Sequence, residues 1–363
     1  MSPLPKACRL LIVTDAWVPQ VNGVVRTLQS TIKELSAAGF EVEILDSSLF
    51  HTLPCPGDTG IRLALVAPSR VEQLIEQAAP DALHIATEGP LGWAARRIAI
   101  RHGWRFTTAY HTRFPEYLKA RFKVPLNLTY RMLRVFHRPS QAVLVPSRHV
   151  MRQLSIEGFT KLHYWGRGVD HDVFHPEPGQ RSANYQRPIF LYVGRVAVEK
   201  NIQAFLDLDL PGEKWVVGDG PLRPQLQRCY PQVRWFGSLS SSDLASVYRQ
   251  STVFVFPSKT DTFGLVMAEA MACGLPVAAY PVPGPLDVIG RSKAGIMSED
   301  LREACLRCLE IPRAFPIQRA ALFSWRSSAE QFLGALVPMR PPTIRKDFYE
   351  PAQYPALPGP GTA

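Results

Sequence analysis

The apolar positions in the first half of the chain form short runs that alternate with amphipathic stretches. The run 9–15 (RLLIVTD) reads as a buried strand, and 24–40 repeats apolar residues at helical spacing before Gly39 ends it. The same pattern predicts strands at 41–46, 82–87, 105–111 and 141–147 and helices at 71–79 and 90–103. Strands that alternate with helices are typical of βαβ units around a parallel sheet.

A second alternation begins at residue 189. Its apolar runs end in polar or glycine-containing turns, at 189–195, 214–220, 232–238, 252–258 and 276–282. A polar stretch rich in proline and glycine, 175–188, separates the two alternations, and 363 residues exceed one ordinary core. We therefore expect an α/β protein with two doubly wound domains. The predicted bounds are 1–177 and 178–336, followed by a proline-rich arm or tail at 337–363.

The charge of the chain is unevenly distributed. The net charge is +10, and residues 96–167 alone hold 15 Lys and Arg against 2 Asp and Glu. Such a concentrated field indicates an anionic partner, which could be a nucleic acid, a phosphorylated ligand or a membrane surface. No apolar run reaches the ~18 residues that span a bilayer, and the N-terminus lacks the pattern of a signal peptide, so we expect a cytoplasmic location.

Loops that follow the predicted strands carry the candidate chemistry, because ligands of open α/β sheets bind at the carboxyl ends of strands. In the first half, Gly23 would let a phosphate approach a helix N-terminus, unless it only forms an ordinary turn. His111 ends a strand as a potential hydrogen-bonding or acid/base group, or as a satisfied structural histidine.

The loops of the second half add positive charge and glycine. Arg195 and Lys200 share one loop and could neutralise a leaving pyrophosphate, although basic turns are also common at surfaces. Gly218 and Gly220 follow the next strand and would allow a base or ribose to come close.

The stretch 258–277 (SKTDTFGLVMAEAMACGLPV) contains the densest set of candidates. Its loop holds Asp261, which would face a ligand or cap the following helix. Glu269 lies in an otherwise apolar helix, where a buried carboxylate needs partners such as a ribose diol. The helix N-terminus would offer backbone N–H donors to an anion, from Gly264, Leu265 and Val266.

Metal-binding patterns are weak. The DxD pairs Asp170/Asp172 and Asp207/Asp209 and the CxxC pair Cys305/Cys308 have no further ligands nearby in the sequence. We predict no metal and no cofactor. Cationic side chains would take the place of a metal ion at the diphosphate of a bound ligand.

Together these motifs resemble the retaining glycosyltransferases of the GT-B fold, family-four type, over nearly the whole chain. The resemblance rests on NGV, YHT, GRGVDHDVFHP, YVGRVAVEKN, GDGP and the 258–277 stretch, which matches an E-x7-E signature with Asp261 in the first position. It implies two Rossmann-like domains facing across a cleft, Gly23 against the diphosphate, and His111 at the transferred sugar. It also implies Arg195 and Lys200 at the pyrophosphate.

The same resemblance assigns Asp261 to sugar hydroxyls and Glu269 to the ribose. It implies transfer with retention. The acceptor would come from the N-terminal domain, where 113–138 interleaves cations with aromatic and aliphatic residues. We interpret this segment as a membrane-surface element, with an amphipathic helix and solvated basic face as the alternative, and nucleic acid disfavoured because no recognition motif accompanies the charge. Its cations are Arg113, Lys119, Arg121, Lys123, Arg131 and Arg134.

The hypothesis from sequence is a peripheral membrane enzyme at the cytoplasmic face. It would move a hexose from UDP-glucose, UDP-galactose or UDP-glucuronate to a lipid such as diacylglycerol, because the chain looks most similar to bacterial diacylglycerol glycosyltransferases. The alternatives are a GDP-mannose-dependent mannosyltransferase acting on a phospholipid or glycan, a GT-B sugar-nucleotide epimerase, and a binding module without catalysis.

Overall fold

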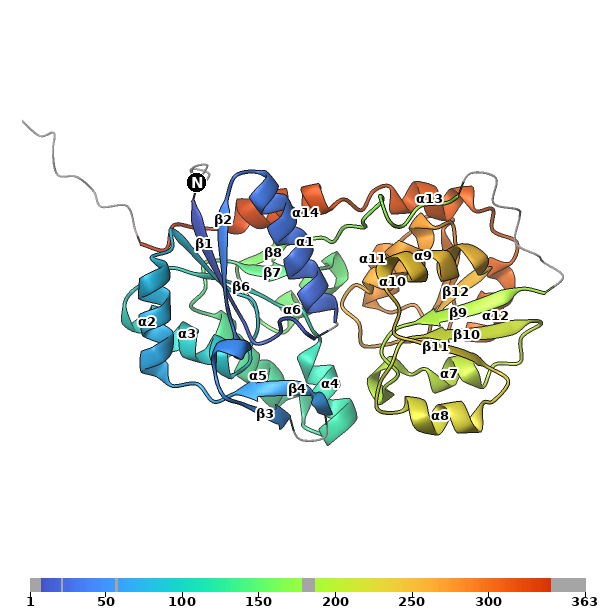
Figure 1. Cartoon of the computed structure of the whole chain (residues 1–363), viewed down its shortest axis with the longest axis horizontal. Helices are drawn as coiled ribbons and strands as arrows, with labels where there is room; N and C mark the ends of the chain where they lie inside the picture. The colour runs from blue at the N-terminus through green and yellow to red at the C-terminus, as the bar shows by residue number, and fades with distance from the viewer. Residues whose placement is uncertain (1–7, 21, 56–57, 178–186, 341–363) are drawn as a thin grey trace, which may run out of the picture.

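Two α/β domains lie side by side in the computed structural model, which describes residues 8–20, 22–55, 58–177 and 187–340 (Figure 1). Each domain contains a six-stranded sheet in which every strand pair is parallel, as the alternation predicts. The predicted linker falls mostly on 178–186, which lie outside the described residues.

The N-terminal sheet has the order β2-β1-β5-β6-β7-β8. Its strands are β1 (Arg9–Thr14), β2 (Glu41–Asp46), β5 (Ala82–Ile85), β6 (Thr107–Ala109), β7 (Val143–Val145) and β8 (Leu162–Tyr164). The helices around it are α1 (Gly23–Ala37), α2 (Pro68–Ala78), α3 (Pro90–Arg101), α4 (Phe114–Phe122), α5 (Leu126–His137) and α6 (Arg148–Ile156). A short η1 turn (Ser47–Leu49) leads into an antiparallel hairpin, β3 (Thr52–Cys55) and β4 (Asp58–Ala64), which the sequence pattern did not predict.

The C-terminal sheet has the order β11-β10-β9-β12-β13-β14. Its strands are β9 (Ile189–Val193), β10 (Glu213–Val217), β11 (Arg234–Gly237), β12 (Val253–Phe256), β13 (Val277–Ala279) and β14 (Gly295–Met297). Its helical elements are η2 (Val198–Lys200), α7 (Gln203–Leu206), α8 (Arg223–Cys229), α9 (Ser241–Gln250), α10 (Leu265–Ala272), α11 (Pro283–Val288), α12 (Leu301–Cys308) and α13 (Ala314–Ala320). The last helix of the described chain is α14 (Trp325–Ala335).

Local sequence explains these elements. The central strands are short apolar runs with both faces buried, as β12 shows along its whole length, whereas the edge strand β8 is only half-buried. Several helices begin at a capping side chain: Asn22 accepts hydrogen bonds from the backbone of α1, and Ser147 does so for α6. The buried face of α12 includes Cys305 and Cys308, so these cysteines are core residues of the helix, as expected.

Both sheets reverse their strand order next to their first strand. The reversal lies between β1 and β5 in the N-terminal sheet and between β9 and β12 in the C-terminal sheet. Ligands of open α/β sheets bind beside such a switch point, at the carboxyl ends of the strands. The loops after β1, β9 and β12 are those that carry Gly23, Lys200 and Asp261.

The C-terminal end of the described chain returns to the N-terminal domain. The chain runs from α13 along the top of the molecule in Figure 1 to α14, which packs on α1. Phe332 of α14 lies in one core cluster with Leu10 and Trp165. The predicted boundary at 336 is therefore wrong, because α14 completes the core of the other domain. Of the predicted arm or tail, residues 337–340 form no helix or strand and pack on the body as an arm would, since Met339 is buried and its carbonyl accepts a hydrogen bond from Arg105 N at 2.7 Å. Residues 341–363 lie outside the described part.

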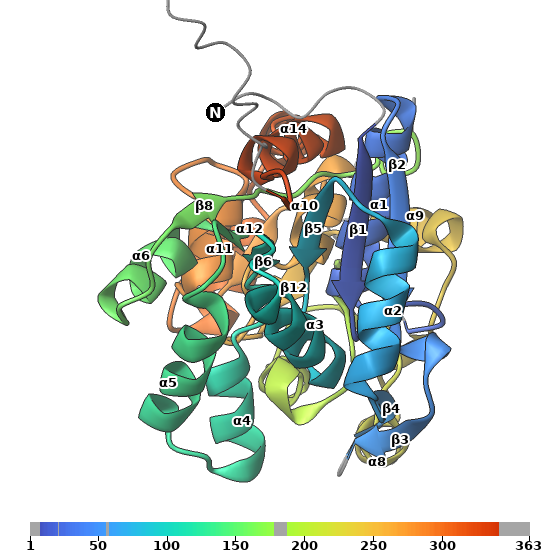
Figure 2. The ribbon, with the colours of Figure 1, turned by 90° about the vertical axis from the view of Figure 1, so that its left-hand side faces the viewer.

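Helices α4 and α5 extend from the body of the N-terminal domain, at the lower left of Figure 2. Lys123, in the left-handed region with φ 56°, ends α4, and Pro125 precedes α5. Among the described residues, no helix is long and apolar enough to cross a membrane.

Candidate active site

The C-terminal wall of the site is formed by the loops after β9 and β12. Lys200 Nζ lies 2.5 Å from Asp261 Oδ1, so two predicted residues form an ion pair. Asn201 Nδ2 donates to Pro257 O at 3.1 Å, and Thr260 Oγ1 donates to Glu199 O at 3.0 Å. These bonds hold the two loops together at the switch point. Arg195, half-buried, begins the same loop as Lys200.

The N-terminus of α10 faces Gly23 across the cleft. Gly264 has φ 82°, and a Cβ there would lie 2.8 Å from Met267 Cε and 2.9 Å from Phe256 Cζ, so both backbone and space require glycine. The one atom within 4 Å of a Cβ placed at Gly23 is Leu265 Cδ1, at 4.0 Å. The structure therefore brings the predicted donor residues Gly23, Gly264 and Leu265 together from both domains, and Val266 follows on the first turn of α10.

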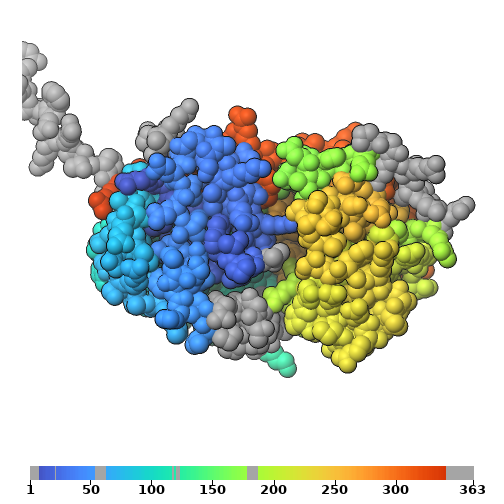
Figure 3. Space-filling view, in the orientation of Figure 1, coloured from blue at the N-terminus to red at the C-terminus, as the bar shows by residue number. Residues whose placement is uncertain are grey.

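Glu269 is buried, and both of its carboxylate oxygens have partners. Arg26 Nη1, from α1 of the opposite domain, lies 2.5 Å from Oε1, and the Tyr248 hydroxyl donates to Oε2 at 3.3 Å. Arg26 Nη2 also donates to Ser241 Oγ at 3.3 Å, and Figure 3 shows the two lobes in contact along this seam. Burial raises the pKa of Glu269, while the positive charge of Arg26 acts in the opposite direction.

The assignment of Glu269 to a ribose stays a prediction. The structure shows that Arg26 occupies one of the acceptor positions that a ribose diol would use at Oε1. The sequence pattern did not reveal this contact, because Arg26 and Glu269 are 243 positions apart and belong to different domains.

His111 is buried between the domains and is fixed on one side. Arg167 Nη2 donates to its Nδ1 at 3.2 Å, and Thr262 Oγ1, from the C-terminal domain, donates to its carbonyl oxygen at 2.8 Å. Burial lowers the pKa of His111 well below its ordinary value, and the charge of Arg167 lowers it further. The imidazole is thus neutral near pH 7. Because Nδ1 is an acceptor, the ring proton sits on Nε2.

Two of the predicted residues carry buried polar atoms that lack a partner among the described residues. These atoms are His111 Nε2, a donor, and Asp261 Oδ2, an acceptor. Buried polar groups are nearly always hydrogen-bonded, so these two atoms are candidates to bind the hydroxyl groups of a ligand. Five further buried atoms of the described residues also lack a partner.

Gly218 and Gly220 have a different reason to be glycine than the one predicted. A Cβ at Gly218 would lie 2.0 Å from Gly194 O, and one at Gly220 would lie 2.4 Å from Val196 O. The loops after β9 and β10 thus pack backbone against backbone at these positions. The described contacts explain both glycines without a base or ribose.

The cations of the predicted membrane segment separate into two groups. Arg113 points into the interdomain seam, where it donates to Lys259 O at 3.1 Å and pairs with Glu116 at 2.7 Å, so its assignment to a membrane surface is wrong. Arg134 donates to Glu157 O at 2.7 Å and is half-buried. Lys119, Lys123 and Arg131 are exposed, and the side chain of Arg121 lies outside the description.

The exposed face of α5 also carries apolar side chains. Leu128, Met132 and Val135 are 59%, 37% and 51% exposed, at a spacing that places them on one face of the helix. We call α4 and α5 together the arm. Helix α4 of the arm lies against η2, which carries Lys200. A molecule bound against α4 would therefore lie near Lys200, which is predicted to hold the leaving diphosphate.

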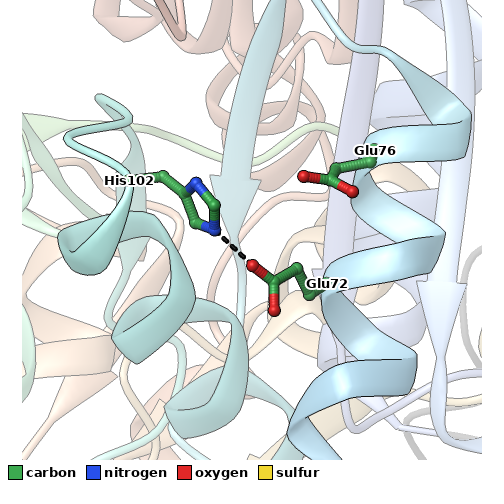
Figure 4. Close-up of side chains that lie close together, drawn as sticks. All are labelled: Glu72, Glu76 and His102. Atoms are coloured by element: carbon green, nitrogen blue, oxygen red, sulfur yellow. Dashed lines mark hydrogen bonds and ion pairs between the residues drawn. The ribbon is translucent and has the colours of Figure 1, made fainter.

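One cluster in the described part of the chain has metal-ligating side chains close together. Glu72 and Glu76 on α2 face His102, as Figure 4 shows. Arg101 already neutralises Glu72, and α2 lies on the far side of the N-terminal domain from the cleft (Figure 1). This cluster cannot serve the diphosphate.

Sequence reasoning missed the residues that act through other site residues. Arg26, Arg167, Tyr248 and Thr262 each contact a predicted residue but were not singled out. Arg167 lies within GRGVD and Arg26 three positions after Gly23, so motif position was an available signal for both.

The two α/β domains, each with a parallel sheet, meet at a seam that holds cations, the neutral His111 and polar atoms without a partner. This is the arrangement expected of a GT-B type transferase. Residues 21–173 match the profile described as Glycosyltransferase Family 4, and residues 187–310 match Glycosyl transferases group 1. The chain belongs to the GT-B glycosyltransferases of family four, a class of enzymes that transfer a sugar.

Several curated proteins are similar to this chain. A GDP-mannose-dependent alpha-mannosyltransferase of Mycobacterium tuberculosis is 29% identical over 316 residues, covering 80% of this chain and 83% of that protein. Sulfoquinovosyl transferase SQD2 of Arabidopsis thaliana is 31% identical, covering 78% of this chain and 62% of that protein. An alpha-monoglucosyldiacylglycerol synthase of Streptococcus pneumoniae is 27% identical, covering 83% and 78%.

A solved structure shows the same fold. Sucrose-phosphate synthase from Thermosynechococcus elongatus superposes with a TM-score of 0.71 at 20% identity, covering 90% of this chain and 97% of that one. The predicted GT-B architecture is confirmed.

Proposed function

We propose that this glycosyltransferase moves a hexose from a nucleotide diphosphate sugar to the hydroxyl group of a membrane lipid, with retention and without a metal. The open pair of His111 Nε2 and Asp261 Oδ2 is the observation that carries the proposal. The first atom can donate to a sugar hydroxyl, and the second can accept from one.

The reaction breaks the bond between the anomeric carbon and the phosphate oxygen of the donor. Negative charge then develops on the leaving diphosphate, and Lys200 and Arg195, in one loop beside the α10 N-terminus, supply the opposing charge. The acceptor oxygen forms the new bond on the face that the diphosphate leaves, and its proton passes to the departing phosphate oxygen. Asp261, paired with Lys200, orients the sugar and keeps the lysine over the diphosphate.

The arm supports a lipid acceptor. Exposed cations (Lys119, Lys123, Arg131) stand beside exposed apolar side chains (Leu128, Met132, Val135), the combination that binds an anionic bilayer surface. The similarity to an alpha-monoglucosyldiacylglycerol synthase supports diacylglycerol as the acceptor and a glucosyl group as the transferred sugar. We propose UDP-glucose, UDP-galactose or UDP-glucuronate as the donor. Such an enzyme would act at the cytoplasmic face of the plasma membrane.

A GDP-mannose-dependent mannosyl transfer is the second candidate. It is favoured by the similarity to the mycobacterial mannosyltransferase, which reaches 29% identity over nearly the same length. Both candidates use the same cleft chemistry. They differ in the base, in the sugar and in the acceptor, which for mannosyl transfer would be a phospholipid or a glycan.

Donor profiling tests both candidates. The full chain is incubated with UDP-glucose, UDP-galactose, UDP-glucuronate and GDP-mannose, each with and without anionic vesicles that contain diacylglycerol. We expect nucleotide release from one donor that depends on the vesicles. Epimerised donor without any acceptor would overturn the transferase proposal in favour of an epimerase, and no turnover of any donor would favour a binding module. Vesicle-independent turnover would overturn the lipid acceptor alone.

A further inference from the structure

A cavity of about 370 Å³ lies between the two domains, beside α14. Its walls come from both domains and from α14. They include Arg148, Tyr164, Arg167, Asp287, Arg319 and Gln331. The proposed transfer reaction uses none of its space. Cavities of this size are large enough for a small organic ligand.

Three guanidinium groups line this cavity, those of Arg148, Arg167 and Arg319. None of them forms an ion pair within the described part of the protein, although the negative charge of Asp287 acts on Arg319. Arg167 is buried, with 6% of its surface exposed. Among the described residues, it donates to Trp165 O, Gly166 O and His111 Nδ1. Arg319 donates to two backbone carbonyls, and Arg148 stacks 5.0 Å from the ring centre of Tyr164.

The one carboxylate in the cavity wall is already engaged. Asp287 Oδ1 lies 2.8 Å from His149 Nδ1, and its Oδ2 accepts from His149 N at 3.1 Å. A buried guanidinium without a counter-charge is costly, because solvation is lost and no ion pair replaces it. The cavity therefore has an excess of positive charge that an anion would balance.

Neighbouring residues leave room for neutral hydrogen bonds. A Cβ at Gly166 would lie 2.8 Å from the Tyr164 hydroxyl, so glycine keeps the cavity open beside that group. Ser324 and Ser327 also line the cavity. Guanidinium groups that converge with hydroxyl groups suit a phosphate, whose oxygens accept several hydrogen bonds at once.

We propose that this cavity is a second anion site, distinct from the donor cleft, which binds inorganic phosphate or a small phosphate monoester. The bound phosphate links Arg148 and Arg167 of the N-terminal domain to Arg319 of the C-terminal domain. It favours the arrangement in which Thr262 reaches His111 across the seam. The same Arg167 that contacts the phosphate holds His111 Nδ1, so occupancy acts on the catalytic histidine.

Calorimetry of the full chain tests this site with inorganic phosphate and with glycerol phosphate, each against sodium chloride at equal ionic strength. Arg148→Gln removes an exposed charge from the cavity wall. Arg152→Gln removes an exposed charge one turn later on the same helix, outside the cavity wall, and is the matched control. We expect affinity for phosphate to fall at least about tenfold in Arg148→Gln and to stay within about twofold in Arg152→Gln.

Lys200→Ala separates this site from the donor cleft. Phosphate binding that persists in Lys200→Ala but weakens in Arg148→Gln supports the cavity. Loss of binding in Lys200→Ala alone would place the phosphate at the donor diphosphate, and would overturn this inference while leaving the proposed transfer intact. Equal weakening in both arginine variants, or no binding beyond that of chloride, would also overturn it. Tighter binding of glycerol phosphate than of inorganic phosphate would identify the ligand as an organic monoester.

Discussion

The interdomain seam and the arm are both rich in cations, but they use them in opposite ways. In the seam, Lys200 pairs with Asp261, Arg26 with Glu269, and Arg113 reaches a backbone carbonyl of the other domain. On the arm, Lys119, Lys123 and Arg131 face solvent. Positive charge in the seam is held in place for a reaction, whereas positive charge on the arm is available to a surface.

This difference has a physical cause. A partnered, desolvated cation keeps its position and acts strongly on a nearby charge, because little water screens it. An exposed cation contributes little to folding but adds to long-range attraction toward an anionic surface. The two groups should therefore respond to substitution in different measurements.

Charge reversal on the arm should give the largest effect. In a variant with Lys119→Glu, Lys123→Glu and Arg131→Glu, each lost cation removes about 1 kcal/mol of attraction to an anionic leaflet, and reversal adds repulsion. Co-sedimentation with anionic vesicles at low salt should fall at least about 100-fold. A matched triple with Arg70, Arg97 and Arg152 changed to Glu, all exposed elsewhere on the N-terminal domain, should retain binding. Equal losses in the two triples would mean that the arm is only a solvated face.

Lys200→Ala should act on turnover and not on vesicle binding. Loss of a preorganised charge at the leaving group should lower turnover about 100-fold or more, near 2.7 kcal/mol. Lys259→Ala is the control, because its side chain is exposed in the loop that carries Asp261 and stacks on Tyr280 instead. A wild-type rate for Lys200→Ala would refute the role given to Lys200.

Arg26→Ala tests whether the pair with Glu269 competes with the donor. If the ribose takes the place of the guanidinium, removing Arg26 frees Oε1 of Glu269 and should lower KM for the donor about fivefold, equivalent to about 1 kcal/mol. Arg26→Lys keeps the charge and should change KM less. An increase in KM for Arg26→Ala would instead indicate that Arg26 contacts the donor directly.

The pH dependence of stability gives a difference of similar small size that is the most specific to one residue. Burial lowers the pKa of His111 well below 6.5, so the unfolded chain takes up a proton at this residue below about pH 6.5 while the folded protein does not. The contribution of His111 is present above pH 6.5 and declines on acidification, by at most about 1.4 kcal/mol per pH unit.

Thermal or urea unfolding between pH 7.5 and 5.5 measures this slope. In His111→Asn, the free energy of unfolding should fall less steeply with decreasing pH than in the wild type. His175→Asn is the control, because it removes an exposed histidine. An unchanged slope in His111→Asn would show that the imidazole does not resist protonation in the folded protein.

The sequence was sufficient for most of the fold. Apolar runs with buried faces predicted the main strands of both sheets, because a parallel strand buried on both sides leaves a continuous apolar signature. The β3–β4 hairpin was missed, since its residues (TLPC and DTGIRLA) include a proline and mixed polarity that weaken the period of two. The return of α14 was also missed, because an amphipathic pattern shows that a face is buried but not against which domain.

Sequence by itself determined the chemistry that this protein carries: glycine-containing loops after strands, the Asp261–Glu269 stretch, the cations at 195 and 200, and a basic segment near the middle of the chain. Only the tertiary structure decided which of these groups meet. It turned Arg113 into the seam, placed Arg26 on Glu269, and left His111 Nε2 and Asp261 Oδ2 open. The reason is physical: residue type sets what a group can bind, whereas its protonation, solvation and partner depend on neighbours that are distant in the chain.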